Sequence, residues 1–246
     1  MAEHYGALFF GEREAAVYDE HEADMFTPEV VTPIVDVLAS LAGTGAALEM
    51  GIGTGRIALP LAARGVSVHG IDASSAMVAK LRAKPGGDAM NVVIGDFSST
   101  RVDGAFTLVY LIFNTIFNLK TQDEQVACFQ NAAAHLVTGG HFVVELGVPD
   151  LQRLSPGQDV YVYRVDARTM SFDTYDVVTQ GLTSNHFVID DGRVSSFPVE
   201  GRYAWPSELD LMARLAGMRL SERWAGWKRE TFTSLSRSHV SVYGKQ

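Results

Sequence analysis

The chain has 246 residues, of which 47% are hydrophobic and 20% charged, as in a folded globular protein rather than a disordered one. Its formal net charge of −9 argues against a nucleic-acid-binding surface, because phosphate binding needs clustered Lys and Arg. The single Cys128 excludes an internal disulfide, and no metal site is expected. We also expect neither a signal peptide nor a membrane-spanning segment.

The first part of the chain alternates between strand and helix patterns. The expected helices cover 12–25, 30–41, 56–64, 74–84 and 121–136, and the expected strands cover 46–50, 66–72, 91–94, 106–113 and 141–146. Ser74 is a suitable N-cap, and Thr121 with Glu124 forms a capping box. This alternation predicts an α/β fold with a Rossmann-like, doubly wound and mostly parallel sheet of seven strands.

The pattern changes after the fifth strand. Residues 160–203 alternate with a period of two, and Asp191-Gly192 is a hairpin signal, so we expect an antiparallel β insert over one end of the sheet. A helix at 206–216 and strands at 218–224 and 238–243 complete the sheet. A single domain of 1–246 is expected, divided into an N-terminal helical cap (1–45), a cofactor-binding core (46–149), the insert or lid (150–205) and the final helix and strands (206–246).

The most informative motif joins the first two expected strands. Residues 47–55 read Ala-Leu-Glu-Met-Gly-Ile-Gly-Thr-Gly, and the next strand ends at Asp72. Alternate glycines let the backbone approach a ligand closely, and an acid after the second strand suits ribose hydroxyls. Dinucleotide sites need G-x-G-x-x-G, but the position of their third glycine is Arg56 here. Glu49 would repel a pyrophosphate, whereas it suits a cationic ligand with an amino group.

These residues resemble the first motif, E/D-x-G-x-G-x-G, of the class I S-adenosylmethionine (SAM)-dependent methyltransferases. Further family motifs follow in order at 95–97 (Gly-Asp-Phe), at 111–113 and at 136–140, where Thr138 replaces the usual Pro. The resemblance covers about 46–146. It implies an enzyme that uses SAM, releases S-adenosylhomocysteine and methylates N, O or C of a small-molecule acceptor. A looser likeness, based on architecture, is to members from actinobacterial secondary metabolism.

The resemblance also implies roles for individual residues. Glu49 and the glycine backbone would hold the methionine portion, Asp72 the ribose, and Asp96 with Phe97 the adenine. The full expected set of cofactor-binding residues is Tyr18, Glu49, Gly51, Gly53, Asp72, Ala73, Met77, Asp96, Phe97 and Leu111.

The acceptor is expected outside the carboxyl ends of the strands, where ligands of open α/β sheets bind. Asn114 and Phe117 follow the fourth strand, while Tyr203 and Trp205 end the insert and are either substrate-binding or core residues. The candidates for a general base are Glu145, His186 and His239. Methyl transfer by positioning alone is the alternative.

Two other functions stay open at this point, a nicotinamide-dependent oxidoreductase on a similar sheet and a non-catalytic SAM-binding protein. Family members that methylate DNA or protein amide nitrogen carry an N/D-P-P-Y run after the fourth strand. This run is missing here, which disfavours nucleic acid as the acceptor, and the expected lid favours a small-molecule acceptor. We expect a cytoplasmic protein, monomeric or homodimeric, that binds a small-molecule acceptor and neither nucleic acid nor membrane.

Overall fold

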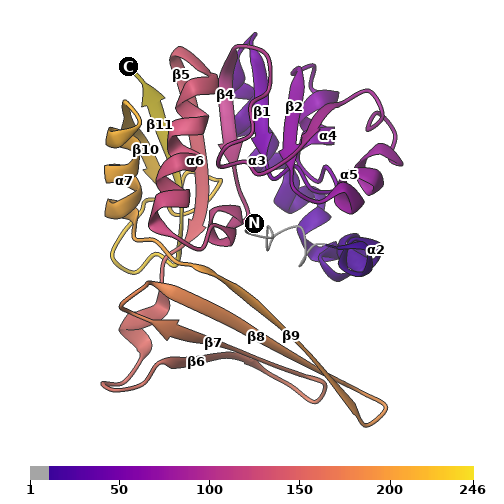
Figure 1. The fold of residues 1–246 in the computed structure, drawn as a ribbon, viewed down its shortest axis with the longest axis vertical. Coiled ribbons are helices and arrows are strands. Elements are labelled where there is room, and N and C mark those ends of the chain that lie inside the picture. The colour runs from indigo at the N-terminus through magenta and orange to yellow at the C-terminus, as the bar shows by residue number, and fades with distance from the viewer. Residues whose placement is uncertain (1–10) are drawn as a thin grey trace.

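The strands of the larger sheet lie in the order β10-β11-β5-β4-β1-β2-β3 in the computed structural model, which describes residues 11–246 (Figure 1). Their bounds are Ala46–Met50 (β1), Val68–Asp72 (β2), Asn91–Ile94 (β3), Phe106–Leu111 (β4), Leu136–Gly147 (β5), Met218–Trp224 (β10) and Ser238–Lys245 (β11). Neighbouring strands are parallel except where β11 pairs with β5 and β10. The predicted seven-stranded, mostly parallel sheet is confirmed. Residues 1–10 of the expected cap lie outside the described residues.

Helices cover both faces of this sheet. The helices α3 (Pro28–Ala42), α4 (Ala58–Ala63) and α5 (Ser75–Arg82) pack on one face, and α6 (Gln122–His135) and α7 (Pro206–Leu215) pack on the other. Strand β1 lies between β2 and β4, so the order of the strands reverses beside it. Ligands of such sheets bind at this reversal, outside the carboxyl ends of the strands. The fold therefore places the site beyond Met50 and Leu111.

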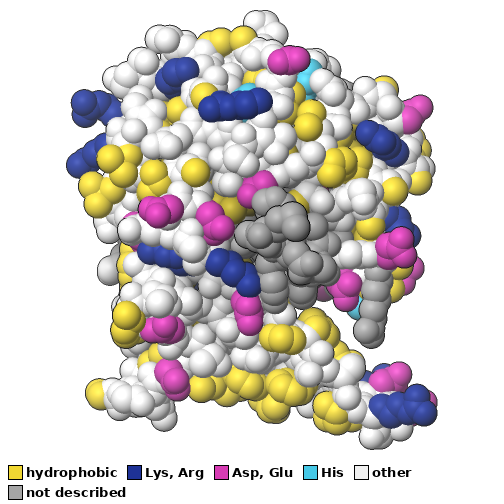
Figure 2. All heavy atoms as spheres, in the orientation of Figure 1, with side chains coloured by type: hydrophobic (Ala, Val, Ile, Leu, Met, Phe, Trp, Pro, Cys, Tyr) yellow, Lys and Arg dark blue, Asp and Glu magenta, His cyan; other side chains and the backbone are white. Residues whose placement is uncertain are grey.

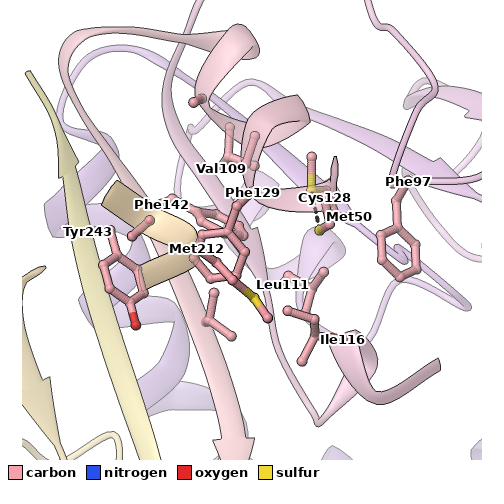
Figure 3. Packing of buried hydrophobic residues seen from close by; sticks show 14 of the residues in the cluster. Met50, Phe97, Val109, Leu111, Ile116, Cys128, Phe129, Phe142, Met212 and Tyr243 are labelled. Carbon is pink, nitrogen blue, oxygen red and sulfur yellow. Dashed lines mark hydrogen bonds between the residues drawn. The ribbon is translucent and has the colours of Figure 1, made fainter. Parts of the chain in front are cut away.

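The core on the α6 and α7 side is built around aromatic rings that meet edge to face. The Phe129 ring lies 5.1 Å from Phe142 and 5.6 Å from Tyr243, measured between ring centroids (Figure 3). Strand β4 is buried on both faces from Leu108 to Leu111. This double burial explains why the strand reads as a continuous apolar run, as central parallel strands do.

Most local signals in the sequence have their expected structure. Ser74 Oγ accepts a hydrogen bond from the Met77 N–H, and Thr121 and Glu124 form the predicted capping box. Several boundaries differ by a few residues; the helix expected at 12–25, for example, ends at His21, and the short helix η1 (Ala23–Phe26) follows it. The helix expected at 56–64 begins at Ala58, because the glycine loop continues in turns through Ile57. The strand expected at 141–146 begins earlier, so residues 136–140 form the first part of β5, which pairs with β4 across an irregularity.

The insert is a separate antiparallel sheet in the order β6-β7-β8-β9. Its strands are Val160–Val165 (β6), Thr169–Asp176 (β7), Gly181–Asp190 (β8) and Arg193–Arg202 (β9), and the short helix η3 (Asp150–Arg153) precedes them. Asp191 (φ 44°) and Gly192 (φ 76°) form the β8–β9 turn, which confirms the predicted hairpin. Figure 1 shows this sheet beneath the end of the larger sheet where β5 leaves it.

The face of the molecule shown in Figure 2 is mixed in charge. In Figure 2, Lys and Arg side chains are spread among acidic ones, and apolar side chains gather over the insert at the bottom of the view. Exposed apolar side chains of the insert include Val162, Val165 and Val194. Among residues 11–246, the helices lack the length and hydrophobicity that crossing a bilayer requires.

Candidate active site

The loop after β1 has backbone conformations that favour glycine. Gly51, Gly53 and Gly55 have φ angles of 76°, 54° and 82°. A Cβ on Gly51 would lie 2.7 Å from Thr115 Cγ2, and a Cβ on Gly55 would overlap Leu81 of α5. The third glycine therefore serves helix packing, whereas a side chain at Gly51 would collide with Thr115 after the end of β4.

Glu49 is the most unusual ionisable group of the site. Its carboxylate is 4% exposed and accepts a hydrogen bond of 3.0 Å from the Tyr110 hydroxyl. Burial raises the pKa of Glu49 to about 8, although the Tyr110 hydrogen bond and the nearby Arg56 charge oppose this shift. A buried acid that is costly to ionise favours a cationic partner such as an ammonium group.

Asp72 lies at the carboxyl end of β2 and fastens the glycine loop. Its two carboxylate oxygens accept hydrogen bonds from the Gly53 N–H (2.7 Å) and the Ser74 N–H (2.8 Å). Burial raises the pKa of Asp72. Ala73 follows it and is half-buried, and the Met77 methyl lies 3.7 Å from where a Cβ on Gly53 would be. These expected cofactor-binding residues therefore converge at the ends of β1 and β2.

Tyr18 reaches the same place from α2 (Glu12–His21). It lines a small cavity of about 50 Å³ together with Glu49, Gly51, Arg56 and Phe113. Burial raises the pKa of the Tyr18 phenol to about 12, so it stays protonated at neutral pH. Ligand sites usually enclose about 300–1,000 Å³. This cavity is therefore smaller than a whole SAM site and marks only the part beside Glu49 and Tyr18.

Helix α2 is held over the loop by contacts that the sequence does not predict. Asp19 accepts a hydrogen bond from Thr54 Oγ1 (2.6 Å) and pairs with Lys84 Nζ (2.5 Å). Lys84 also donates to the Thr54 carbonyl at 2.8 Å. Because these partners lie 30 or more residues apart along the chain, no local pattern reveals them.

The chain turns sharply where β4 ends. Phe113 (φ 57°) and Asn114 (φ 59°) are both left-handed, which is costly for residues with a side chain and is typical of functional sites. The Asn114 Oδ1 accepts a hydrogen bond from the Gly147 N–H at 2.7 Å. The Arg56 guanidinium lies 4.6 Å from the Phe113 ring centroid. The turn thus joins the glycine loop to the ends of β4 and β5.

Glu145 supports this turn with its carboxylate. One oxygen accepts a hydrogen bond from the Phe113 N–H and the other from Trp227 Nε1, both at 2.8 Å. A carboxylate with both oxygens bonded in this way is placed to hold the backbone. Two further residues also approach the site, Trp227 from the segment after β10 and Thr115 from the segment after β4.

The segment after the turn is the short helix η2 (Thr115–Asn118). Phe117 in it is half-buried and packs against the base of β9, since a Cβ on Gly201 would lie 2.5 Å from its ring. The structure thus brings Asn114 and Phe117 to the carboxyl edge of the sheet, next to the insert.

Three other predicted residues have side chains in the core. Leu111 is fully buried and Phe97 is 8% exposed, and both belong to the cluster around Met50 (Figure 3). The Leu111 side chain therefore packs in the core, and its part in binding the cofactor stays a prediction. Asp96 precedes Phe97 and caps the following turn through a hydrogen bond from the Ser98 N–H. Tyr203 is also buried, packed against Tyr175 and Trp205 where the insert joins α7.

The two histidines proposed as bases lie in different surroundings. His186 belongs to the insert, where it stacks on Phe197 and lies within hydrogen-bonding distance of Ser184. His239 is fully buried on β11 and bonds Ser241 Oγ through Nδ1, while its Nε2 has no hydrogen-bond partner among residues 11–246. Burial lowers the pKa of His239 to about 4, so it is neutral at pH 7.

The site residues fit SAM. A glycine cradle that a side chain would fill stands beside a buried acid suited to an ammonium group, and a second acid ends β2 where a ribose would lie. Glu49 at the edge of the cradle suits a pyrophosphate poorly. The donor set therefore matches an amino acid joined to a nucleoside better than a dinucleotide.

Known proteins are similar to this chain over nearly its whole length. Residues 47–140 match the family model of a methyltransferase domain. The CcbJ methyltransferase from Streptomyces caelestis is 38% identical, with a TM-score of 0.85 over 97% of this chain and 98% of that one. The cypemycin N-terminal methyltransferase from a Streptomyces species is 28% identical, over 81% of this chain and 82% of that protein. CalS10, an amino pentose methyltransferase from Micromonospora echinaspora, shares the fold at 22% identity, with a TM-score of 0.70 over 94% of this chain and 97% of that one.

These similarities support methyl transfer over the nicotinamide-dependent oxidoreductase and the non-catalytic protein that the sequence left open. The identity to CcbJ extends through the cap, the core and the insert. SAM is the methyl donor of this family. The chain belongs to the class I S-adenosylmethionine-dependent methyltransferases.

Proposed function

We propose that this methyltransferase acts on the nitrogen of an uncharged amine in a small molecule or a short peptide. The observation that carries the proposal is the left-handed Phe113–Asn114 turn, which lies beside the glycine loop and leads into the segment that packs against the insert. Nitrogen as the acceptor atom is supported by relatives described as an N-terminal methyltransferase and a glycopeptide N-methyltransferase. The insert limits access to this edge, which favours a small acceptor.

On the donor side, we assign the methionine ammonium to Glu49 and the ribose to Asp72. Asp96 and the backbone of Phe97 would border the adenine. Asp72 accepts a hydrogen bond from the Gly53 N–H, and this bond keeps the loop in the conformation that admits the ligand. When bound, SAM supplies an electrophilic methyl group on a positively charged sulfur. The residues of this chain fix its orientation.

On the acceptor side, we propose that the protein works by positioning. Glu145 holds Phe113 and Trp227 with its two oxygens, and His239 is buried on β11. Neither side chain is placed to take a proton from an amine above the turn. The acceptor would then bind in its uncharged form, held near Tyr18, Asn114 and Phe117 and in line with the departing sulfur.

A panel of amines paired with their N-acetylated forms tests this proposal. We would incubate the protein with SAM and D-glucosamine, alanylalanine, benzylamine or the acetylated form of each, and follow methyl transfer by mass spectrometry. We expect at least one free amine to be methylated on nitrogen and its acetylated form to be inert, because acetylation removes the nucleophilic lone pair. The rate should rise with pH towards the pKa of that amine. Methylation on oxygen or carbon, or equal transfer to an acetylated form, would contradict the proposal.

A further inference from the structure

Helix α6 carries two buried amide side chains that reach in different directions. Gln125 is fully buried and Asn131 is 2% exposed. Each donates hydrogen bonds to backbone carbonyls of a loop outside the helix. Buried carbonyls need such partners, because leaving one unpaired is costly. The two loops lead to opposite halves of the site.

Gln125 holds the acceptor side. Its Nε2 lies 3.4 Å from the carbonyl of Ile116 and 3.3 Å from that of Leu119, which lie in and directly after η2. It also donates to the Arg202 carbonyl at 3.0 Å, while its Oε1 accepts a 2.6 Å hydrogen bond from the Arg202 guanidinium. Gln125 thus joins the segment that carries Phe117 to the base of β9.

Arg202 extends this connection to the rest of the insert. Its guanidinium is 4% exposed and bonds Gln180 Oε1 (3.1 Å), between β7 and β8, and Glu208 Oε1 (2.7 Å) of α7. A Cβ on the adjacent Gly201 would lie 2.2 Å from the Phe117 carbonyl oxygen. The end of β9 is therefore packed directly on η2, so the position of the insert and that of Phe117 are linked.

Asn131 holds the donor side. Its Nδ2 donates to the carbonyls of Phe97 (2.8 Å) and Thr100 (2.9 Å). Asp96, next to Phe97, is expected at the adenine. One turn further along α6, His135 Nε2 accepts a hydrogen bond from the Val102 N–H, which fixes the end of the same loop. The loop from 96 to 102 therefore depends on two side chains of α6.

We propose that Gln125 and Asn131 are separate positioning residues, Gln125 for the acceptor segment 114–118 and Asn131 for the donor segment 96–100. The acceptor half rests on the proposed function, since it takes η2 as part of the acceptor site. The two amides have the same chemistry, are buried to a similar degree and lie on the same helix. A general loss of stability would therefore affect both variants alike, whereas positioning would affect different steps.

The test compares Gln125→Met with Asn131→Leu, which remove the amide at similar volume. We would follow hydrogen exchange in residues 113–119 and 96–102. We would measure the affinity for S-adenosylhomocysteine by calorimetry and KM with the best amine of the panel. We expect Gln125→Met to speed exchange in 113–119 and raise KM about tenfold, with unchanged S-adenosylhomocysteine affinity. We expect Asn131→Leu to speed exchange in 96–102 and weaken that affinity about tenfold, with unchanged KM.

Lys245→Met is the matched control, because Lys245 also donates to two carbonyls of this region, Ala133 O and Leu136 O, away from both loops. It should leave affinity, KM and exchange in both loops unchanged. If an apolar variant does not fold, a polar variant replaces it. Gln125→Asn carries an amide that is too short to reach η2. Asn131→Ser donates at most one hydrogen bond. Equal effects of both variants on both ligands, or no effect on either, would overturn the proposal. If no amine is methylated, the proposed function fails, while exchange and S-adenosylhomocysteine affinity still decide this inference.

Discussion

Replacing Gly51 with valine is expected to abolish S-adenosylhomocysteine binding in a protein that still folds. Gly51 has a φ of 76°, and a Cβ there would lie 2.7 Å from Thr115 Cγ2. The branched side chain would collide with Thr115 and strain the loop after β1, where the ligand is expected to meet the backbone. Calorimetry should show an affinity loss of at least about 100-fold, that is, about 2.7 kcal/mol or more.

Gly65→Val provides the matched control. Gly65 has a similar φ of 88°, yet within residues 11–246 no atom beyond its chain neighbours lies within 4 Å of the position of its Cβ. The variant therefore carries comparable backbone strain without blocking the loop after β1. It should lose stability but bind S-adenosylhomocysteine normally. Normal binding by Gly51→Val, or equal loss in Gly65→Val, would show that the loop does not hold the ligand.

The second large effect is expected at Glu49. Its pKa of about 8 means that most Glu49 side chains are protonated at pH 6. Pairing with the ligand ammonium requires the ionised form, so binding below pH 8 must release a proton. The affinity for S-adenosylhomocysteine should therefore increase as pH rises from 6 to 8, by up to about tenfold per unit, and level off above. Glu49→Gln should lower the affinity at pH 8 by about 10–100-fold, because a hydrogen bond to a charged group is lost.

Titrations at pH 7 in two buffers with different ionisation enthalpies would count the released proton. The wild-type protein should release a large fraction of one proton, and Glu49→Gln should release none. Asp36→Asn, which removes the exposed ion pair with Arg64, serves as a surface control and should behave like the wild type. A flat affinity between pH 6 and 8 would contradict the pairing of Glu49 with an ammonium group.

Patterns that are local in sequence predicted the fold well. The β1 and β2 runs with the intervening glycines, the Ser74 and Thr121 caps and the Asp191-Gly192 hairpin depend on neighbouring residues, and the structure confirms them. The structure also confirms the mostly parallel, doubly wound sheet, for which right-handed connections leave few arrangements.

Features that depend on distant partners were not predictable. The left-handed turn at Phe113 is held by Glu145, 32 residues away, and α2 is held by Asp19 and Thr54, 35 residues apart. The side chain of Leu111 faces the core because both faces of β4 are covered. A sequence pattern marks a strand end, but it does not show which of its side chains face a ligand.

The central claim is that Glu49 and the glycine loop hold the amino acid part of SAM. Its most direct test is a calorimetric titration with S-adenosylhomocysteine, with NADH titrated as the control. The account predicts micromolar binding of S-adenosylhomocysteine, accompanied by proton release at pH 7, and no binding of NADH. Binding of NADH in preference to S-adenosylhomocysteine would contradict the assignment of this site.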